Sequence, residues 1–180
     1  MQKLWEGSVH IDAPVDEVWA YVADFNRHPE WDGFTKEIAL AKSGDELGVG
    51  SEWKVREQLG MLKSEGNKTW LEHGVAPAKR EIRHVNPKQK IVWFTHPVPK
   101  IGVNAEFSFE LIPDNGGTLV RQAVDLHVPG VMNVVGLVLA PKRDKLQQAA
   151  WQKNLNQLKS VVEGSATREA AAPEREAVAV

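Results

Sequence analysis

The stretch that decides the fold runs from Val9 to Trp31 and reads VHIDAPVDEVWAYVADFNRHPEW. Alternation of side chains up to Asp12 predicts a β-strand, and the proline that follows predicts its end. Pro14 suits the first position of a helix, because the N–H that proline lacks needs no partner there. The stretch therefore predicts a strand that stops abruptly and passes directly into a helix.

The predicted helix after Pro14 has one apolar face. Its apolar side chains recur at helical spacing, and two acidic residues stand in the first turn, where they favour the positive end of the helix dipole. The apolar residues are Val15, Val18, Trp19 and Val22, and the acidic residues are Asp16 and Glu17. Asn26 to Trp31 predicts a second, short helical turn.

Beyond Trp31 the chain is typical of a run of strands followed by one long helix. Strands are predicted at 34–41, 51–59, 68–72, 80–86, 90–96, 101–111 and 118–128, and a loop at 76–78. The stretch from 60 to 79 is the hardest to interpret. Helical periodicity extends from Pro141 to Glu163, and Gly164 is expected to end that helix.

Composition and charge narrow the class of protein. A chain of 180 residues suits one domain, expected at 1–163, followed by a disordered tail at 164–180. The formal net charge of −2 gives no support to a nucleic-acid partner. The absence of cysteine excludes thiolate metal sites and cysteine nucleophiles. The six histidines show no metal-ligand spacing, so neither a metal nor a cofactor is expected.

Hydrophobic patterning makes a cytoplasmic protein the expectation. The first residues lack the apolar core of a signal peptide. The longest nearly apolar run, Val131 to Ala140, is far shorter than the ~20 residues of a transmembrane helix.

The order of the predicted elements indicates an α+β fold class. Strands and helices do not alternate in the middle of the chain, so a parallel sheet is disfavoured. We expect a curved antiparallel β-sheet of six to seven strands wrapped around a long C-terminal helix, with two short helices after the first strand. Such a sheet encloses space between itself and the helix, and that space is either packed or a cavity.

Several segments resemble the START/Bet v 1-like (SRPBCC) superfamily, in particular its polyketide cyclase/dehydrase-type branch. The matching segments are Asp12-Ala13-Pro14, Val18-Trp19, Ala23-Asp24-Phe25, Pro29-Glu30-Trp31-Asp32 and Leu155-Asn156-Gln157-Leu158-Lys159, and the resemblance covers about residues 3–163. It implies a helix-grip fold with a hydrophobic cavity. Members of the superfamily bind lipids, sterols, quinones, hormones or polyketides, and some are enzymes.

The function expected first is non-covalent binding of a small hydrophobic ligand, such as a lipid, a quinone or a polyketide-like molecule, between the sheet and the C-terminal helix. The predicted ligand-binding residues are Val18, Trp19, Val22, Trp53, Trp93, His96, Phe107, Phe109, Gln122, Val124, Val135, Leu139 and Leu146, with Val120 and Leu155 as further apolar walls. Gln122 lies on an apolar face and His96 at a strand end, so both are candidates to orient a polar group of the ligand.

The segment from Val131 to Ala140 has two interpretations. It is either a gate through which the ligand enters or the buried first turns of the last helix. Lys142, Arg143 and Lys145 follow it and oppose the dipole of a helix start. They either contact an anionic head group or form a solvated face, so transient membrane contact through Val131–Arg143 is one hypothesis.

An enzyme is the alternative function, with a polyketide cyclase/dehydratase-like activity that uses His96 or Glu57. Alternation places Glu57 on the face of Trp53 and Val55, where burial would raise the pKa of its carboxyl group. The cost of burying an unpaired charge instead favours an exposed Glu57 at a wet edge. A protein-interaction module that uses the sheet surface is a third hypothesis.

Overall fold

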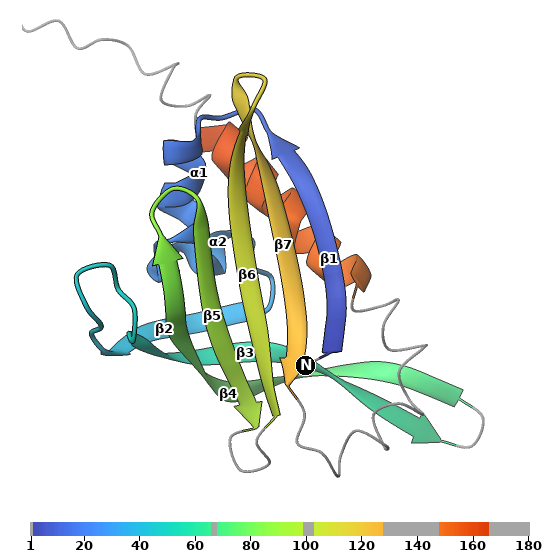
Figure 1. Ribbon diagram of the computed structural model, residues 1–180. Helices are drawn as coiled ribbons and strands as arrows, with labels where there is room; N and C mark the ends of the chain where they lie inside the picture. Colours follow the sequence, from blue (N-terminus) through green and yellow to red (C-terminus); the bar gives the residue numbers. More distant parts are fainter. Residues whose placement is uncertain (1, 66–67, 99–102, 128–147, 166–180) are drawn as a thin grey trace, which may run out of the picture.

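The computed structural model describes residues 2–65, 68–98, 103–127 and 148–165. The strands are β1 (Gln2–Ile11), β2 (Thr35–Lys42), β3 (Glu52–Glu65), β4 (Lys68–Asn86), β5 (Lys90–Val98), β6 (Val103–Asp114) and β7 (Gly117–His127). Between β1 and β2 lie helix α1 (Val15–Val22), a 3-10 turn η1 (Phe25–Arg27) and the short helix α2 (His28–Trp31). A C-terminal helix occupies residues 148–165 (Figure 1).

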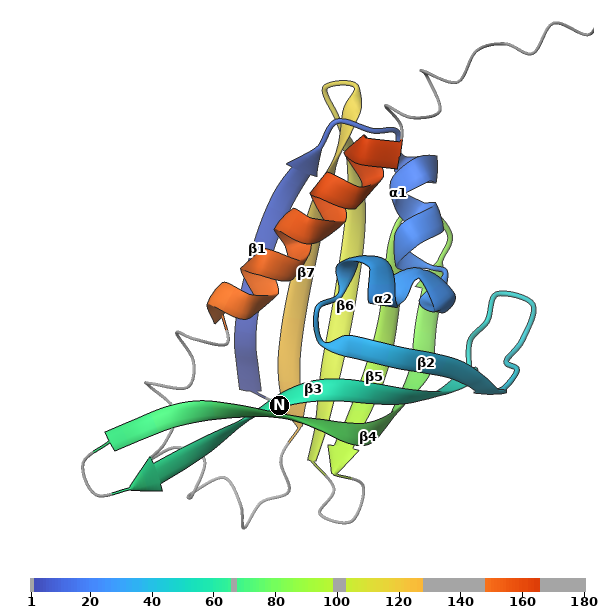
Figure 2. The ribbon, with the colours of Figure 1, turned by 180° about the vertical axis from the view of Figure 1, so that it is seen from behind.

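All seven strands belong to one antiparallel sheet in the order β1-β7-β6-β5-β4-β3-β2. The sheet bends strongly, so that β2 and β3 run across the direction of β6 and β7 (Figure 1). The C-terminal helix lies diagonally over the concave face, and α1 and α2 lie beside its end (Figure 2). This is the predicted helix-grip architecture, and the expectation of six to seven strands is confirmed.

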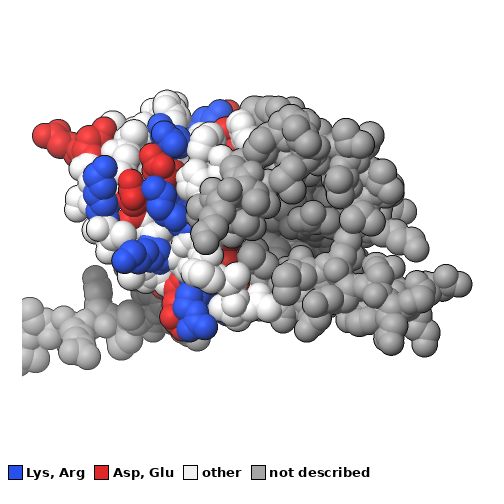
Figure 3. Space-filling view, turned by 90° about the horizontal axis from the view of Figure 1, so that it is seen from below, with Lys and Arg blue, Asp and Glu red and all other residues white. Residues whose placement is uncertain are grey.

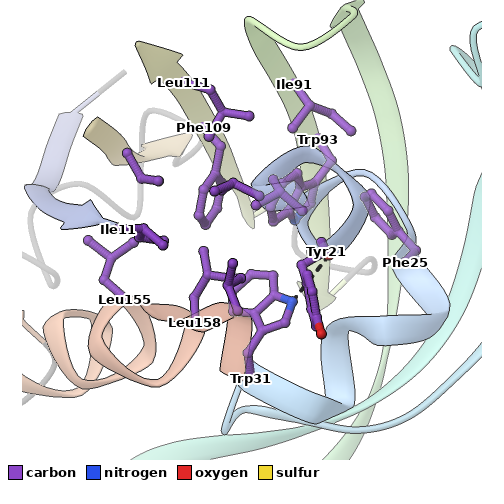
Figure 4. Close-up of a cluster of buried hydrophobic side chains, with 14 of the residues drawn as sticks. Ile11, Tyr21, Phe25, Trp31, Ile91, Trp93, Phe109, Leu111, Leu155 and Leu158 are labelled. Carbon is purple, nitrogen blue, oxygen red and sulfur yellow. Dashed lines mark hydrogen bonds between the residues drawn. The ribbon is translucent and has the colours of Figure 1, made fainter. Parts of the chain in front are cut away.

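The hydrophobic core lies between the C-terminal helix and the sheet. Every large apolar side chain on the inner stripe of the helix is buried, namely Trp151, Leu155, Leu158 and Val162. Leu155 and Leu158 point toward Ile11 and Phe109 of the sheet, while Trp31 packs from α2 (Figure 4). The helical spacing that predicted this element is therefore the spacing that fills the core.

The turn between β6 and β7 fixes the register of the concave face. Asn115 and Gly116 both have positive φ values, 48° and 83°, which is the requirement of a type I′ hairpin. The resulting register pairs Phe109 with Gln122 and Phe107 with Val124.

The prediction of a loop at 76–78 is wrong. β3 and β4 form one long hairpin, and Pro77 lies within β4, opposite Arg56. The pairing between β4 and β5 begins only at Lys79, so the backbone at Pro77 needs no donor toward β5. A proline is tolerated at such an edge position.

The end of the C-terminal helix also differs from expectation. The helix continues through Gly164 to Ser165, whose hydroxyl donates a 2.7 Å hydrogen bond to the carbonyl of Val162. A side chain therefore satisfies one of the last carbonyls, in place of a glycine stop. Within the described residues, no helix is long and apolar enough to cross a membrane.

Candidate functional site

The burial of apolar side chains on the concave face decreases along the strands β6 and β7. Phe109, Val120 and Val124 are buried without accessible surface, so they belong to a sealed core. Ala105 and Leu126, further along the same inner face and paired with each other across β6 and β7, are only half-buried. The accessible apolar surface of the interior therefore begins where Ala105 and Leu126 lie.

Aromatic rings from distant segments meet between these two regions. The Phe25 ring stacks on His28 at 4.3 Å and on Trp53 at 5.5 Å, and it meets the edge of Trp93 at 5.3 Å. Trp93 in turn stacks on Phe107 at 5.7 Å. The indoles of Trp53 and Trp93 therefore both pack against the Phe25 ring.

Four buried polar atoms on the concave face have no hydrogen-bond partner within the described part of the chain. They are Nε1 of Trp53, Nε1 of Trp93, Oγ1 of Thr95 and Oε1 of Gln122. Each such group costs about 1–3 kcal/mol when it is left unsatisfied.

A buried ionic cluster, centred on the Arg80 guanidinium, adjoins these aromatic rings. Its Nε donates to Oε1 of Glu57 at 2.8 Å, and one terminal nitrogen donates to Oδ2 of Asp32 at 2.9 Å and to Oγ1 of Thr35 at 2.7 Å. The other terminal nitrogen lies 2.9 Å from Nδ1 of His28. All five side chains are buried, Arg80 being 4% exposed.

The hydrogen bonds assign the protons of the His28 ring. Nε2 lies 3.0 Å from the carbonyl of Val22, which can only accept, and Nδ1 faces Arg80, which can only donate. The ring is therefore neutral with its proton on Nε2. Burial, and after it the nearby Arg80 cation, lowers the pKa of His28 to about 4.

The two carboxyl groups of the cluster respond differently to the same burial. Burial alone would raise the pKa of Asp32, but Arg80 and the Thr35 hydroxyl outweigh it and hold this pKa below its usual value. Burial raises the pKa of Glu57, and Arg80 offsets this effect only in part. Each nitrogen of the Arg80 guanidinium has a hydrogen-bond partner. Asp32 is the most firmly ionised of these partners.

The cluster also anchors the C-terminal helix. Nδ2 of Asn154 donates to Oδ1 of Asp32 at 2.7 Å, and Oδ1 of Asn154 accepts from the backbone N–H of Gly33 at 3.2 Å. Through these bonds the helix, the α2–β2 connection and Arg80 of β4 become one hydrogen-bonded unit.

Most of the described residues among the predicted ligand-binding positions lie in or against the hydrophobic core. Val18, Val22, Trp53, Trp93, Phe109 and Val124 are buried, and Trp19 and Phe107 are partly buried against the core. Gln122 is buried with an unpartnered oxygen. Val135, Leu139 and Leu146 lie outside the described residues, as do the predicted gate at 131–140, the three basic residues at 142–145 and the tail from 166 onward.

His96 occupies the face opposite to the one that its hypothesis required. Nδ1 of His96 contacts Oδ1 of Asn104 at 2.5 Å, and its Nε2 lies 3.8 Å from a Glu81 carboxylate oxygen. Strand alternation turns its neighbour Thr95 toward the concave interior, so His96 points to the convex side. We therefore do not retain His96 as a group that orients an interior ligand.

The expectation of a wet Glu57 is wrong, for a reason that the sequence pattern alone does not reveal. Glu57 is buried, as its alternation with Trp53 and Val55 indicated. The positive charge of Arg80 offsets the cost of burying its carboxyl group. Arg56, the adjacent charge, is exposed and pairs with Glu37. Sequence reasoning missed the partner because it comes from another strand.

The other members of the cluster were also missed by the sequence analysis. His28 is the first residue of α2, Asp32 follows its last residue, and Thr35 begins β2. The available signal was Arg80 itself, which alternates with the buried Ile82 and so had to be an inward cation. An inward arginine predicts buried carboxylates, although it does not say which. The described residues contain no group of side chains suited to hold a metal ion.

Comparison with known proteins agrees with this geometry. The family described as polyketide cyclase / dehydrase and lipid transport matches residues 4–163. The chain belongs to this family, and its membership in the START/Bet v 1-like superfamily is confirmed. No protein with a curated description matches the chain.

Solved structures show the same fold at low identity. Ara h 8.0201 is 14% identical with a TM-score of 0.60, over 88% of this chain and 95% of its own. TTHA0849 from Thermus thermophilus is 15% identical with a TM-score of 0.58, over 93% and 98%. The di-domain ARO/CYC StfQ of the steffimycin biosynthetic pathway is 12% identical with a TM-score of 0.62, over 91% of this chain and 51% of its own. These likenesses establish the fold and leave the ligand open.

Replacement of Arg80 tests whether the cluster depends on its cation. Arg80→Met keeps an apolar stem but leaves Asp32 and Glu57 buried without a counter-charge, so we expect a loss of about 3–5 kcal/mol in the free energy of unfolding measured with urea. Arg56→Met removes an exposed arginine from the neighbouring strand and should cost less than about 1 kcal/mol. An Arg80→Met protein as stable as the wild type would contradict this account.

The low pKa of His28 makes stability depend on pH. The unfolded chain binds a proton at His28 below its ordinary pKa of 6.5, whereas the folded chain does so only near 4. The unfolded state thus holds more protons in this window, and the stabilisation present above pH 6.5 should fall by about 3 kcal/mol as the pH approaches 4. The free energy of unfolding, measured with urea at several pH values, should change less steeply with pH in His28→Asn than in the wild type. The exposed His84→Asn variant is the control and should keep the wild-type slope. Equal slopes in all three proteins would refute the assignment.

Proposed function

We propose that this protein binds a small apolar molecule non-covalently on the accessible part of its concave face, between the sheet and the C-terminal helix. One observation carries the proposal. The sealed core gives way to half-buried apolar surface at Ala105 and Leu126, and the unpartnered polar atom of Thr95 lies beside Ala105 in the strand register. Apolar walls with a few unsatisfied polar groups are typical of small-molecule sites.

The family supports the same proposal. Its description joins polyketide chemistry with lipid transport, and a lipid is an apolar ligand. Binding energy would come mainly from burial of apolar surface, at about 25 cal/mol per Å².

The other two functions are less well supported by the site. Glu57 is the buried carboxyl group that an enzyme would need, but Arg80 holds it at 2.8 Å within the ionic cluster. The exposed large apolar residues of the described chain are Leu40, Leu47 and Val75, which come from β2, the loop after it and β4. Figure 3 shows Lys and Arg interleaved with Asp and Glu over the described part of one face, which is an ordinary solvated surface.

Filling the accessible region should block binding. Ala105→Phe adds a ring on the concave side of β6, whereas Ala123→Phe adds the same ring to the convex side of the neighbouring strand β7. Native mass spectrometry of the recombinant full-length chain should show a non-covalent adduct of lipid-like mass in the wild type and in Ala123→Phe but not in Ala105→Phe. Circular dichroism confirms that both variants fold.

Two outcomes would refute the proposal. One is a wild-type protein that carries no adduct and does not bind an added apolar probe such as 2-ethylnaphthalene. The other is a folded Ala105→Phe protein that retains the adduct at wild-type occupancy.

A further inference from the structure

The two edge strands of the sheet differ in what covers them. The C-terminal helix bonds the backbone of β1, since Nζ of Lys159 donates to the carbonyl of His10 at 2.8 Å. At the opposite edge, β2 pairs with β3 and with no other strand of the described chain. In the described residues, the hydrogen bonds from the connection before β2 reach only Thr35 and Lys36. The rest of β2 therefore keeps a free edge.

A free strand edge presents unpaired N–H and C=O groups to another strand. We propose that β2 pairs antiparallel with β2 of a second copy of this chain, about a two-fold axis through Ala39, so that two seven-stranded sheets become one. The proposal concerns the edge of the sheet and not its interior, so it does not depend on the proposed ligand binding.

The register of β2 on β3 defines the part that can pair. Two bulges, at Lys36 and Ala41, bound five positions that stand opposite residues 56 to 52 of β3, namely Glu37, Ile38, Ala39, Leu40 and Lys42. Ala39 is the central position. A two-fold axis perpendicular to the sheet brings positions equally far from the axis opposite each other on the same face.

The pairs that this axis creates are complementary. Ile38 meets Leu40 of the second copy on the concave side, where Leu40 is 50% exposed in the single chain. Glu37 meets Lys42 of the second copy on the convex side, and the axis repeats both pairs. Apolar pairs and pairs of opposite charge stabilise neighbouring strands. At the axis itself, the small side chain of Ala39 lets the two strands approach.

The charges on β3 support the same register. Glu37 already pairs with Arg56 at 3.1 Å, and Lys42 lies 3.9 Å from Glu52. The convex row across the interface therefore alternates in sign, from Arg56 and Glu37 of one copy to Lys42 and Glu52 of the other. An axis through Ile38 or Leu40 would instead place Ala39 opposite Glu37 or Lys42, and both ion pairs would be lost.

The fit of β2 to itself favours a second copy over an unrelated strand. Each copy has one free edge, because the helix bonds the backbone of β1, so the association ends at two chains. Five pairing positions bury less than the about 1,200 Å² of a standard interface, so we expect a weak dimer with a dissociation constant on the order of 10–100 μM.

Engineered thiols test the position of the axis, because the chain contains no cysteine. Ala39→Cys places two thiols directly opposite each other, with Cα atoms about 5 Å apart, which suits a disulfide. Lys54→Cys lies on the same face one strand further in, so its two Cα atoms are about 14 Å apart. Mild oxidation should convert most of Ale39→Cys to a covalent dimer and give at least about fivefold less dimer with Lys54→Cys.

Charge reversal tests the ion pairs. Glu37→Lys and Lys42→Glu each set like charges opposite each other twice, so analytical ultracentrifugation should show dimerisation about tenfold weaker than in the wild type. An equimolar mixture of the two variants should dimerise again, because every contact between positions 37 and 42 then joins opposite charges. Glu110→Lys makes the same charge change at an exposed position of β6 and should keep the wild-type constant.

Three results would overturn the proposal. The first is a wild type that stays monomeric up to about 500 μM, which would leave the edge to a strand of another protein. The second is equal cross-linking of the two cysteine variants. The third is a mixture of Glu37→Lys and Lys42→Glu that stays monomeric. None of these results bears on the ligand adduct measured by native mass spectrometry, so the two proposals fail separately.

Discussion

The hydrogen-bonded ion pairs around Arg80 are the constraint on which the rest of the structure depends. One guanidinium from β4 holds a carboxylate that follows α2, a carboxyl group of β3 and a neutral imidazole, and Asn154 extends the network to the C-terminal helix. A buried ionic group is stable only while its partners remain in place. The cluster therefore links the bend of the sheet to the position of the helix that the sheet grips.

The cluster lies in one cross-strand row with the less closed part of the interior. Arg80 pairs with Thr95, Thr95 with Ala105, and Ala105 with Leu126, and the last two are half-buried. Further along the concave face lies a core in which Leu155 and Phe109 have no accessible surface (Figure 4). Because Arg80 is fully engaged, it organises its row without offering it a free positive charge.

Much of the fold could be predicted from local patterns. The strand, Pro14 and the apolar stripe of α1 predicted the opening of the domain. Pro77 misled, because proline argues against a strand except at an edge, and only the pairing of neighbours shows where an edge lies. The site was harder to predict for the same reason. Glu57 and Arg80 are far apart in sequence, and their ion pair exists only through tertiary packing.

The most direct test of the central claim is the protonation of the His28 ring, measured by ¹⁵N NMR of the imidazole nitrogens near pH 5.5. At this pH an ordinary histidine is mostly charged. The account requires His28 to stay neutral, with a protonated Nε2 that donates to Val22 and an unprotonated Nδ1 that accepts from Arg80. A His28 with both nitrogens protonated, or with its single proton on Nδ1, would contradict the network on which the account rests.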